Sequence, residues 1–189
     1  MNTHNASAAL SPAMTMADKM FVTCLVAIVA LVTWLGVLNY KEGLKTEGAK
    51  RNGEAWMAWL AEAGAHRGEA NFAHKACASG VKPDASKEEP IEGTWGACLK
   101  YLMEETELKA LVNPFTGKAP PFVAGCNPAD RSLVGGLLLE DLAPTPAGSP
   151  VPFVATQLVG EDPIDKKMQV RITICDKGSD AIKIGEVEF

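Results

Sequence analysis

The side chains best able to bind a metal ion in this sequence are two histidines and a cysteine, His66, His74 and Cys77. Their spacing matches none of the common zinc patterns, and Cys77 is also needed for the disulfide set described below. The motif Cys-x-x-Cys-His is absent, so covalent c-type haem is not indicated. We therefore expect surface histidines near the end of a helix, and neither a metal site nor a cofactor.

Catalytic chemistry receives no support from the sequence motifs. The chain lacks Gly-x-Ser-x-Gly, His-Glu-x-x-His and a glycine-rich phosphate loop. Glu88–Glu89 and Glu104–Glu105 are expected on solvated faces. The acidic stretch from Glu161 to Asp165 has a composition that suits calcium, but its spacing fits no EF-hand, and a polar turn is the favoured interpretation. The net charge of −5 leaves no basic field for nucleic acid. We expect a protein that is not an enzyme.

Four cysteines outside the apolar N-terminal run form an even set in a small domain, namely Cys77, Cys98, Cys126 and Cys175. Such a set suits two disulfides in an oxidising compartment, and three pairings are possible. Proximity in the sequence favours Cys77–Cys98 together with Cys126–Cys175, each contributing about 3 kcal/mol. The alternative is four unrelated buried thiols. Disulfides would place the domain outside the cytoplasm.

The longest uncharged run extends from Met20 to Leu38 and has 19 residues. As a helix it spans about 28 Å, close to the hydrocarbon thickness of a bilayer. A cleaved signal peptide would have a shorter apolar core and a small-x-small site after it, whereas bulky residues follow here, so we expect retention in the membrane. The basic residues after the run favour a cytoplasmic domain by the positive-inside rule and so oppose the cysteines: Lys41, Lys45, Lys50 and Arg51.

The membrane helix is expected to continue as an amphipathic helix to about Ala65, because Trp56, Leu60 and Ala63 share one face. Three glycines weaken this helix by up to about 1 kcal/mol each and allow some local unwinding: Gly43, Gly48 and Gly53. A loop then leads to a second helix over residues 94–112, which Asn113-Pro114 ends.

Four short runs rich in β-branched and aromatic residues follow, separated by turn residues: 132–142, 151–159, 167–175 and 181–189. Apolar residues alternate regularly from Met168 to Ile174, and Gly185 interrupts the alternation in the last run. The sequence "DKGSD" between the last two runs predicts a hairpin. The expected fold class is α+β, with one long N-terminal helix packed on an antiparallel sheet of about four strands.

This layout resembles that of type IV pilins, the type IVb class above all, and of pseudopilins. The segment "SPAMTMAD" is similar to a prepilin processing region, with Ala13 before the cut, Met14 as the new N-terminus and Asp18 as the fifth residue of the product. The segment "LVNPFTGKAP" resembles the Asn-Pro-aromatic turn that precedes the pilin sheet, and Cys126 and Cys175 bracket the sheet as in many pilins. The sequence departs from the family at Ala13, where glycine is usual, at Asp18, where glutamate is usual, and in a leader without Lys or Arg.

The resemblance implies a leader at residues 1–13, a long helix at 14–65 that contains the transmembrane segment 20–38, and an extracytoplasmic α+β head at 66–189. Each copy would first be a single-pass inner-membrane protein and would then polymerise through its apolar helix into an extracellular filament, a homo-oligomer with the heads outermost. The implied partners are a prepilin peptidase, the pilus assembly machinery and other copies of the chain. The sequence separates neither adhesion, twitching, DNA uptake and secretion as roles of such a filament, nor a major pilin from a minor one or a pseudopilin.

Two site interpretations and one rival function stay open. Asp18 is either the charge partner of the Met14 ammonium of a neighbouring subunit or a flanking charge that pairs with Lys19 at the membrane surface. Trp56 and Trp59 are interface candidates, although Trp56 suits the core and Trp59 suits either the core or a neighbouring subunit. The rival function is that of a bitopic accessory protein, which would keep residues 1–13 and bind a partner in a secretion or other membrane complex.

Overall fold

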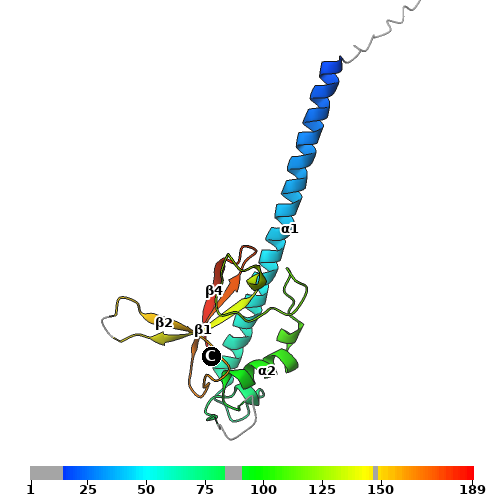
Figure 1. Cartoon of the computed structure of the whole chain (residues 1–189). Helices are drawn as coiled ribbons and strands as arrows, with labels where there is room; N and C mark the ends of the chain where they lie inside the picture. Colours follow the sequence, from blue (N-terminus) through cyan, green and yellow to red (C-terminus); the bar gives the residue numbers. More distant parts are fainter. Residues whose placement is uncertain (1–14, 84–90, 147–148) are drawn as a thin grey trace, which may run out of the picture. The chain divides into compact units, whose positions relative to one another are not determined.

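The structure is a computed structural model, which describes residues 15–83, 91–146 and 149–189 (Figure 1). Contacts divide the chain into two compact units, Met1–Lys41 and Glu42–Phe189, and we call the second unit the head. The helices are α1 (Met16–His66), η1 (Lys75–Cys77), α2 (Trp95–Glu105), η2 (Glu107–Ala110) and η3 (Arg131–Leu133). The strands are β1 (Leu137–Pro144), β2 (Phe153–Gln157), β3 (Gln169–Cys175) and β4 (Ala181–Glu188).

The boundary between the two units lies within α1, earlier than the boundary at 65/66 that the sequence predicted. The reason is burial: from Ala49 onward one face of α1 packs in the core of the head, with Trp56, Leu60 and Ala63 among its buried residues. The shared face that the sequence predicted for these three residues is therefore confirmed. The C-terminal part of α1 is a structural element of the head.

The long helix α1 is continuous, so the local unwinding that its glycines allow does not occur. A Cβ atom at Gly53 would lie 2.7 Å from Ile184 Cγ1 and 3.1 Å from Ile174 Cγ2. A Cβ atom at Gly64 would overlap the carbonyl oxygen of Glu188. Glycine at these two positions lets the helix approach the sheet closely, and this packing offsets the low helix propensity of glycine.

The sheet is antiparallel throughout and has the order β2-β1-β3-β4, which confirms the predicted four strands (Figure 1). Strand β3, one of the two inner strands, carries the regular alternation that the sequence predicted, and Val170, Ile172 and Ile174 are fully buried. β3 and β4 pair across the "DKGSD" turn, so the predicted hairpin is also confirmed. The expected α+β layout is therefore present.

A β-bulge in β4 explains why the apolar alternation breaks at Gly185. Ile172 pairs with Gly185 while the next residue, Thr173, pairs with Lys183, so that Ile184 is the extra residue. A Cβ atom at Gly185 would lie 2.5 Å from Met57 Sδ on α1. The glycine therefore gives the methionine room against the sheet at the point where the strand bends.

The second helix is shorter than predicted, because Thr106 ends it. The Thr106 hydroxyl donates to the carbonyl oxygen of Leu102 at 2.7 Å and accepts from the backbone N–H of Leu108 at 3.2 Å. These bonds replace the helical pattern and start the 3₁₀ turn η2. The predicted helix over residues 94–112 is therefore the α-helix Trp95–Glu105 followed by a separate 3₁₀ turn.

Candidate functional site

The first unit presents an apolar helical surface, because every residue from 20 to 38 is exposed. Trp34, for example, is 68% exposed. The hydroxyls of Thr23 and Thr33 each donate to the carbonyl oxygen four residues earlier, both at 2.8 Å, so they add no unsatisfied polar group. Among the described residues, α1 is the helix that is long and apolar enough to cross a membrane.

Asp18 and Thr15 together cap the N-terminus of α1. The Asp18 carboxylate accepts from the Thr15 backbone N–H at 3.0 Å and from the Thr15 hydroxyl at 2.7 Å, and the Asp18 N–H donates to Thr15 Oγ1 at 3.2 Å. This reciprocal arrangement is a capping box with aspartate in place of glutamate. The predicted processing residues Ala13 and Met14 lie outside the described residues, so the charge pairing between Asp18 and a Met14 ammonium stays a prediction.

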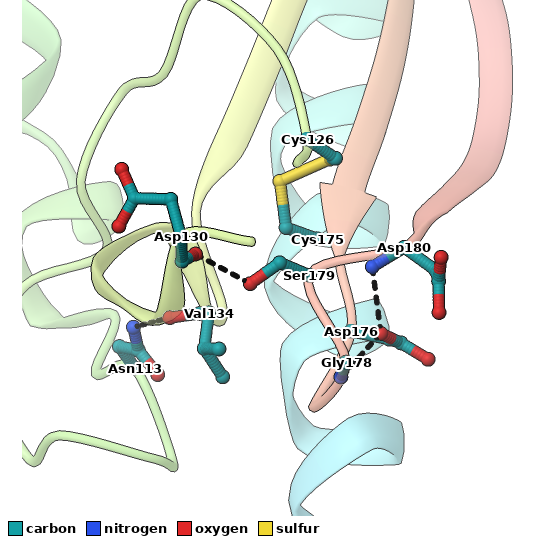
Figure 2. The surroundings of a disulfide bond; sticks show 9 residues. All are labelled: Asn113, Cys126, Asp130, Val134, Cys175, Asp176, Gly178, Ser179 and Asp180. Carbon is teal, nitrogen blue, oxygen red and sulfur yellow. Dashed lines mark hydrogen bonds between the residues drawn. A yellow bond between two sulfur atoms is a disulfide. The ribbon is translucent and has the colours of Figure 1, made fainter. Parts of the chain in front are cut away.

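The first disulfide joins Cys77 to Cys98 and fastens η1 to α2, with the two Cα atoms 4.6 Å apart. Both cysteines are fully buried in the main core. The second disulfide joins Cys126 to Cys175, with the Cα atoms 5.4 Å apart, and ties the loop before η3 to the end of β3 (Figure 2). The pairing that proximity favoured is therefore confirmed, and the alternative of four buried thiols is wrong.

The turn between β3 and β4 packs beside the second disulfide (Figure 2). Asp176 Oδ1 accepts from the N–H groups of Gly178 and Asp180, at 2.6 and 2.9 Å. Ser179 adopts a positive φ of 61° and is fully buried. Its hydroxyl donates to the carbonyl oxygen of Asp130 at 2.8 Å, so the turn is fixed to the loop that leads to η3.

The segment that resembles the Asn-Pro-aromatic turn is organised by Asn113, which is fully buried. Its Oδ1 accepts from the Phe115 N–H at 2.9 Å, and its Nδ2 donates to the carbonyl oxygen of Val134 at 2.8 Å (Figure 2). Gly135 follows with a φ of +71°, and a Cβ atom there would overlap the Asn113 side chain. Asn113 therefore connects the turn to the entry of the sheet.

Both interface candidates lie in the core of the head. Trp56 is 1% and Trp59 is 7% exposed. The Trp59 ring lies 5.3 Å from the ring of His74 and 6.5 Å from that of Phe189. Burial thus supports the core interpretation of both tryptophans and leaves little ring surface for a neighbouring subunit.

The three candidate metal-binding residues do not form a common site. His66 and His74 line the same cleft of about 370 Å³, but Cys77 is in a disulfide. His66 Nδ1 lies 2.8 Å from Glu69 Oε1, and this contact raises the pKa of the histidine, while His74 Nδ1 lies 2.8 Å from the Tyr101 hydroxyl. Within the ranges that the structure describes, no three metal-binding side chains come together.

The acidic stretch 161–165 begins in a turn at Glu161, and Pro163 forms an isolated bridge with Thr94, so the choice between a polar turn and a calcium site stays a prediction. The Asp162 carboxylate accepts from the Val159 N–H at 2.7 Å, and the Asp162 N–H donates to the Val159 carbonyl at 3.1 Å. Ile164 is fully buried, and its N–H donates to the carbonyl oxygen of Gly93 at 3.0 Å. Asp162 therefore acts as a local hydrogen-bond acceptor that closes the turn.

Arg67 is a residue of the core that sequence reasoning missed. It is 2% exposed, and its Nη2 donates to the carbonyl oxygens of Ile164 and Lys166. Its guanidinium carbon lies 4.3 Å from the centre of the Phe189 ring. Burial lowers the pKa of Arg67 to about 10, against a smaller raising effect of Asp165, so the residue stays charged at neutral pH. No sequence signal distinguishes it from the exposed cations near it.

The comparisons with known proteins give no relative. No family model, no curated protein and no solved structure matches this chain. The apolar helix, the helix cap and the disulfide-linked head are therefore the observations on which a function can be proposed.

Proposed function

We propose that this chain is the structural subunit of a type IV pilus-like filament and that it polymerises through the apolar part of α1. The observation that carries the proposal is the uncharged segment 20–38, which is apolar on all sides and satisfies its own hydroxyl groups. Such a helix is stable where lipid or other apolar helices surround it. Copies that pack together provide those surroundings after the helix leaves the bilayer.

The head supports an extracytoplasmic location. Its two disulfides are of a kind that persists in oxidising compartments, and they close loops with sequence separations of 21 and 49 residues. A disulfide stabilises such a loop mainly because it restricts the conformations of the unfolded chain. An extracytoplasmic head on an apolar helix suits a filament whose outer surface consists of heads.

One observation favours the rival, a bitopic membrane-anchored accessory protein. Asp18 already has a partner within its own chain, because it caps α1 with Thr15. A capping role explains an aspartate at this position without any neighbouring subunit. A carboxylate has lone pairs beyond those that Thr15 uses, however, so capping and pairing with an ammonium are compatible.

The experiment separates the charge of Asp18 from its capping role. Asp18→Asn keeps an oxygen that accepts the Thr15 hydrogen bonds but removes the charge that would pair with the ammonium of a neighbour. Thr15→Val removes the hydroxyl of the cap and keeps the charge. Filaments are counted by electron microscopy in the sheared surface fraction of cells, and the amount of chain in membranes is measured as the control for expression.

The filament proposal expects Asp18→Asn to lose filaments while the membrane level of the chain is unchanged, and Thr15→Val to retain them. The accessory-protein hypothesis predicts that no variant forms filaments. It predicts that the chain instead occurs in a complex of small, fixed stoichiometry. Normal filaments from Asp18→Asn would show that charge pairing does not direct assembly.

A further inference from the structure

Strand β2 forms one edge of the sheet and has an unpaired side. Leu158 N donates to Leu139 O at 2.9 Å, and Thr145 N donates to Pro152 O at 3.0 Å. With the register of β1 and β2, these two bonds show which residues of β2 direct their backbone groups towards β1. Because backbone groups alternate along a strand, Phe153, Ala155 and Gln157 direct their N–H and C=O groups away from β1. Within the described residues, no hydrogen bond is recorded at this outer side of β2.

The region around this edge is uncharged and exposed. No charged residue occurs from Ala143 to Val159, and Figure 1 shows β2 and the adjoining end of β1 reaching out from the rest of the head. Val151 is 51%, Phe153 is 40% and Val154 is 50% exposed. An uncharged, apolar edge strand is a template for another strand.

The opposite edge of the same sheet is protected against such pairing. β4 contains the bulge at Ile184, and its Lys183 and Glu186 form an ion pair of 2.6 Å. Bulges and charges at an edge oppose the addition of a strand. β2 has neither a bulge nor a charge, and its five residues contain no proline. The two edges therefore differ in the features that decide whether a second chain can add.

We propose that β2 pairs with β2 of a second copy of this chain, antiparallel and about a two-fold axis at Ala155. In this register Ala155 faces Ala155 of the partner subunit, and Phe153 faces Gln157 of the partner subunit. All three outward residues then form hydrogen-bonded pairs, so every outward N–H and C=O group has a partner. Val154 and Thr156 face each other across the same axis, and no charge opposes another.

A second copy fits this edge better than a strand of another kind. The edge offers no ion pair to a charged strand, whereas a second β2 brings no charge and places the β-branched side chains of Val154 and Thr156 opposite each other. A two-fold contact is isologous and closes after two copies, so it joins chains in pairs and cannot itself build a filament. The proposal therefore stands whether or not copies polymerise through α1.

The first test is a cysteine cross-link in the full chain reconstituted in lipid vesicles, in a Cys24→Ser background. The two Cα atoms at a hydrogen-bonded antiparallel pair lie about 5.5 Å apart, and their Cβ atoms lie farther apart than the roughly 3.5–4.5 Å of a direct disulfide, so a short thiol-specific bifunctional reagent is used to join the two cysteines. Ala155→Cys should give a covalent dimer as the main product. The matched control, Lys183→Cys, places a cysteine at an exposed position of β4 that pairs with Thr173 and not with a native cysteine, and it should stay monomeric.

The second test uses charge. Ala155→Lys places two like charges opposite each other across the axis and should abolish pairing, measured as the loss of the short-distance peak between spin labels on the heads. Ala181→Lys should leave that peak unchanged, and the unfolding temperature of both variants checks that the head is folded. A mixture of Ala155→Lys and Ala155→Glu chains should restore the peak. Equal cross-linking of the two cysteine variants, or a peak that survives Ala155→Lys, would overturn the proposal.

Discussion

Alanine in place of Gly64 should destabilise the head, although alanine is the better helix former. A Cβ atom at Gly64 would lie 2.9 Å from Phe189 Cα and closer still to the carbonyl oxygen of Glu188. These are backbone atoms at the end of β4, where the Phe189 N–H donates to the Met168 carbonyl at 2.8 Å. The new methyl group can be accommodated only if the helix and this strand move apart.

The magnitude follows from two opposing effects. Replacing glycine with alanine in a helix gains up to about 1 kcal/mol. Inserting a methyl group into a packed interface costs about 1–3 kcal/mol, and a rigid backbone neighbour favours the upper part of that range. Because Gly64 lies in the last turn of α1, the gain in helix propensity is small. We expect Gly64→Ala to lower the free energy of unfolding by about 2 kcal/mol.

Two other glycines of α1 provide a graded comparison. A Cβ atom at Gly43 would have nothing within 4 Å, so Gly43→Ala should be neutral or stabilise by up to about 1 kcal/mol. At Gly53 the close atoms belong to the side chains of Ile184 and Ile174, which can shift, so Gly53→Ala should fall between the two.

The assay is urea unfolding of the full chain in detergent, followed by the fluorescence of the buried tryptophans Trp56, Trp59 and Trp95. The expected order of stability is Gly43→Ala above Gly53→Ala above Gly64→Ala. If Gly64→Ala were as stable as Gly43→Ala, the close approach of helix and strand would be wrong.

Three further predictions concern single features of the head. Replacing Cys126 and Cys175 with alanine opens a loop with a sequence separation of 49 residues. The double replacement should lower the free energy of unfolding in urea by about 4 kcal/mol. An unchanged free energy of unfolding would show that this disulfide does not stabilise the head. Arg67→Ala leaves two carbonyl oxygens without their donor and should cost about 2–3 kcal/mol in the same assay, so an unchanged midpoint would contradict this hydrogen-bonding role of Arg67. Burial, and next Asp162, raise the pKa of Asp141 above its ordinary value of 3.8. The folded head therefore takes up this proton more readily than the unfolded chain does, and it gains stability as the pH falls through the raised pKa towards 3.8. Asp141→Asn should remove that gain and stabilise the head at neutral pH, which unfolding at several pH values checks; a parallel pH dependence of variant and parent would contradict it.

Local patterns in the sequence predicted much of the fold. The alternation of apolar residues located β3, and the turn sequence before β4 located the hairpin. The interruption of the apolar alternation at Gly185 marks the bulge. Proximity predicted the disulfide pairing, because each disulfide joins a cysteine to the next cysteine along the chain. The strand, the hairpin and the bulge depend on residues close to one another in the chain, and periodicity reports them directly, whereas the disulfide pairing followed from the order of the cysteines.

Features that depend on distant segments could not be predicted. The glycines of α1 look like weak points of a helix until the sheet that approaches them is known. Arg67 looks like a surface cation until its carbonyl partners at Ile164 and Lys166 are in place. The sequence alone does not decide whether Trp59 is a core residue or an interface residue, since its position on the helix does not show that His74 and Phe189 cover it.

The most direct test of the proposed filament is the intact mass and N-terminal sequence of the protein, taken from native membranes and from the sheared surface fraction of the same cells. The proposal predicts a chain that begins at Met14, with or without N-methylation, and that is present in the sheared fraction. A chain that still begins at Met1 and is confined to the membrane fraction would contradict the filament and favour the accessory protein.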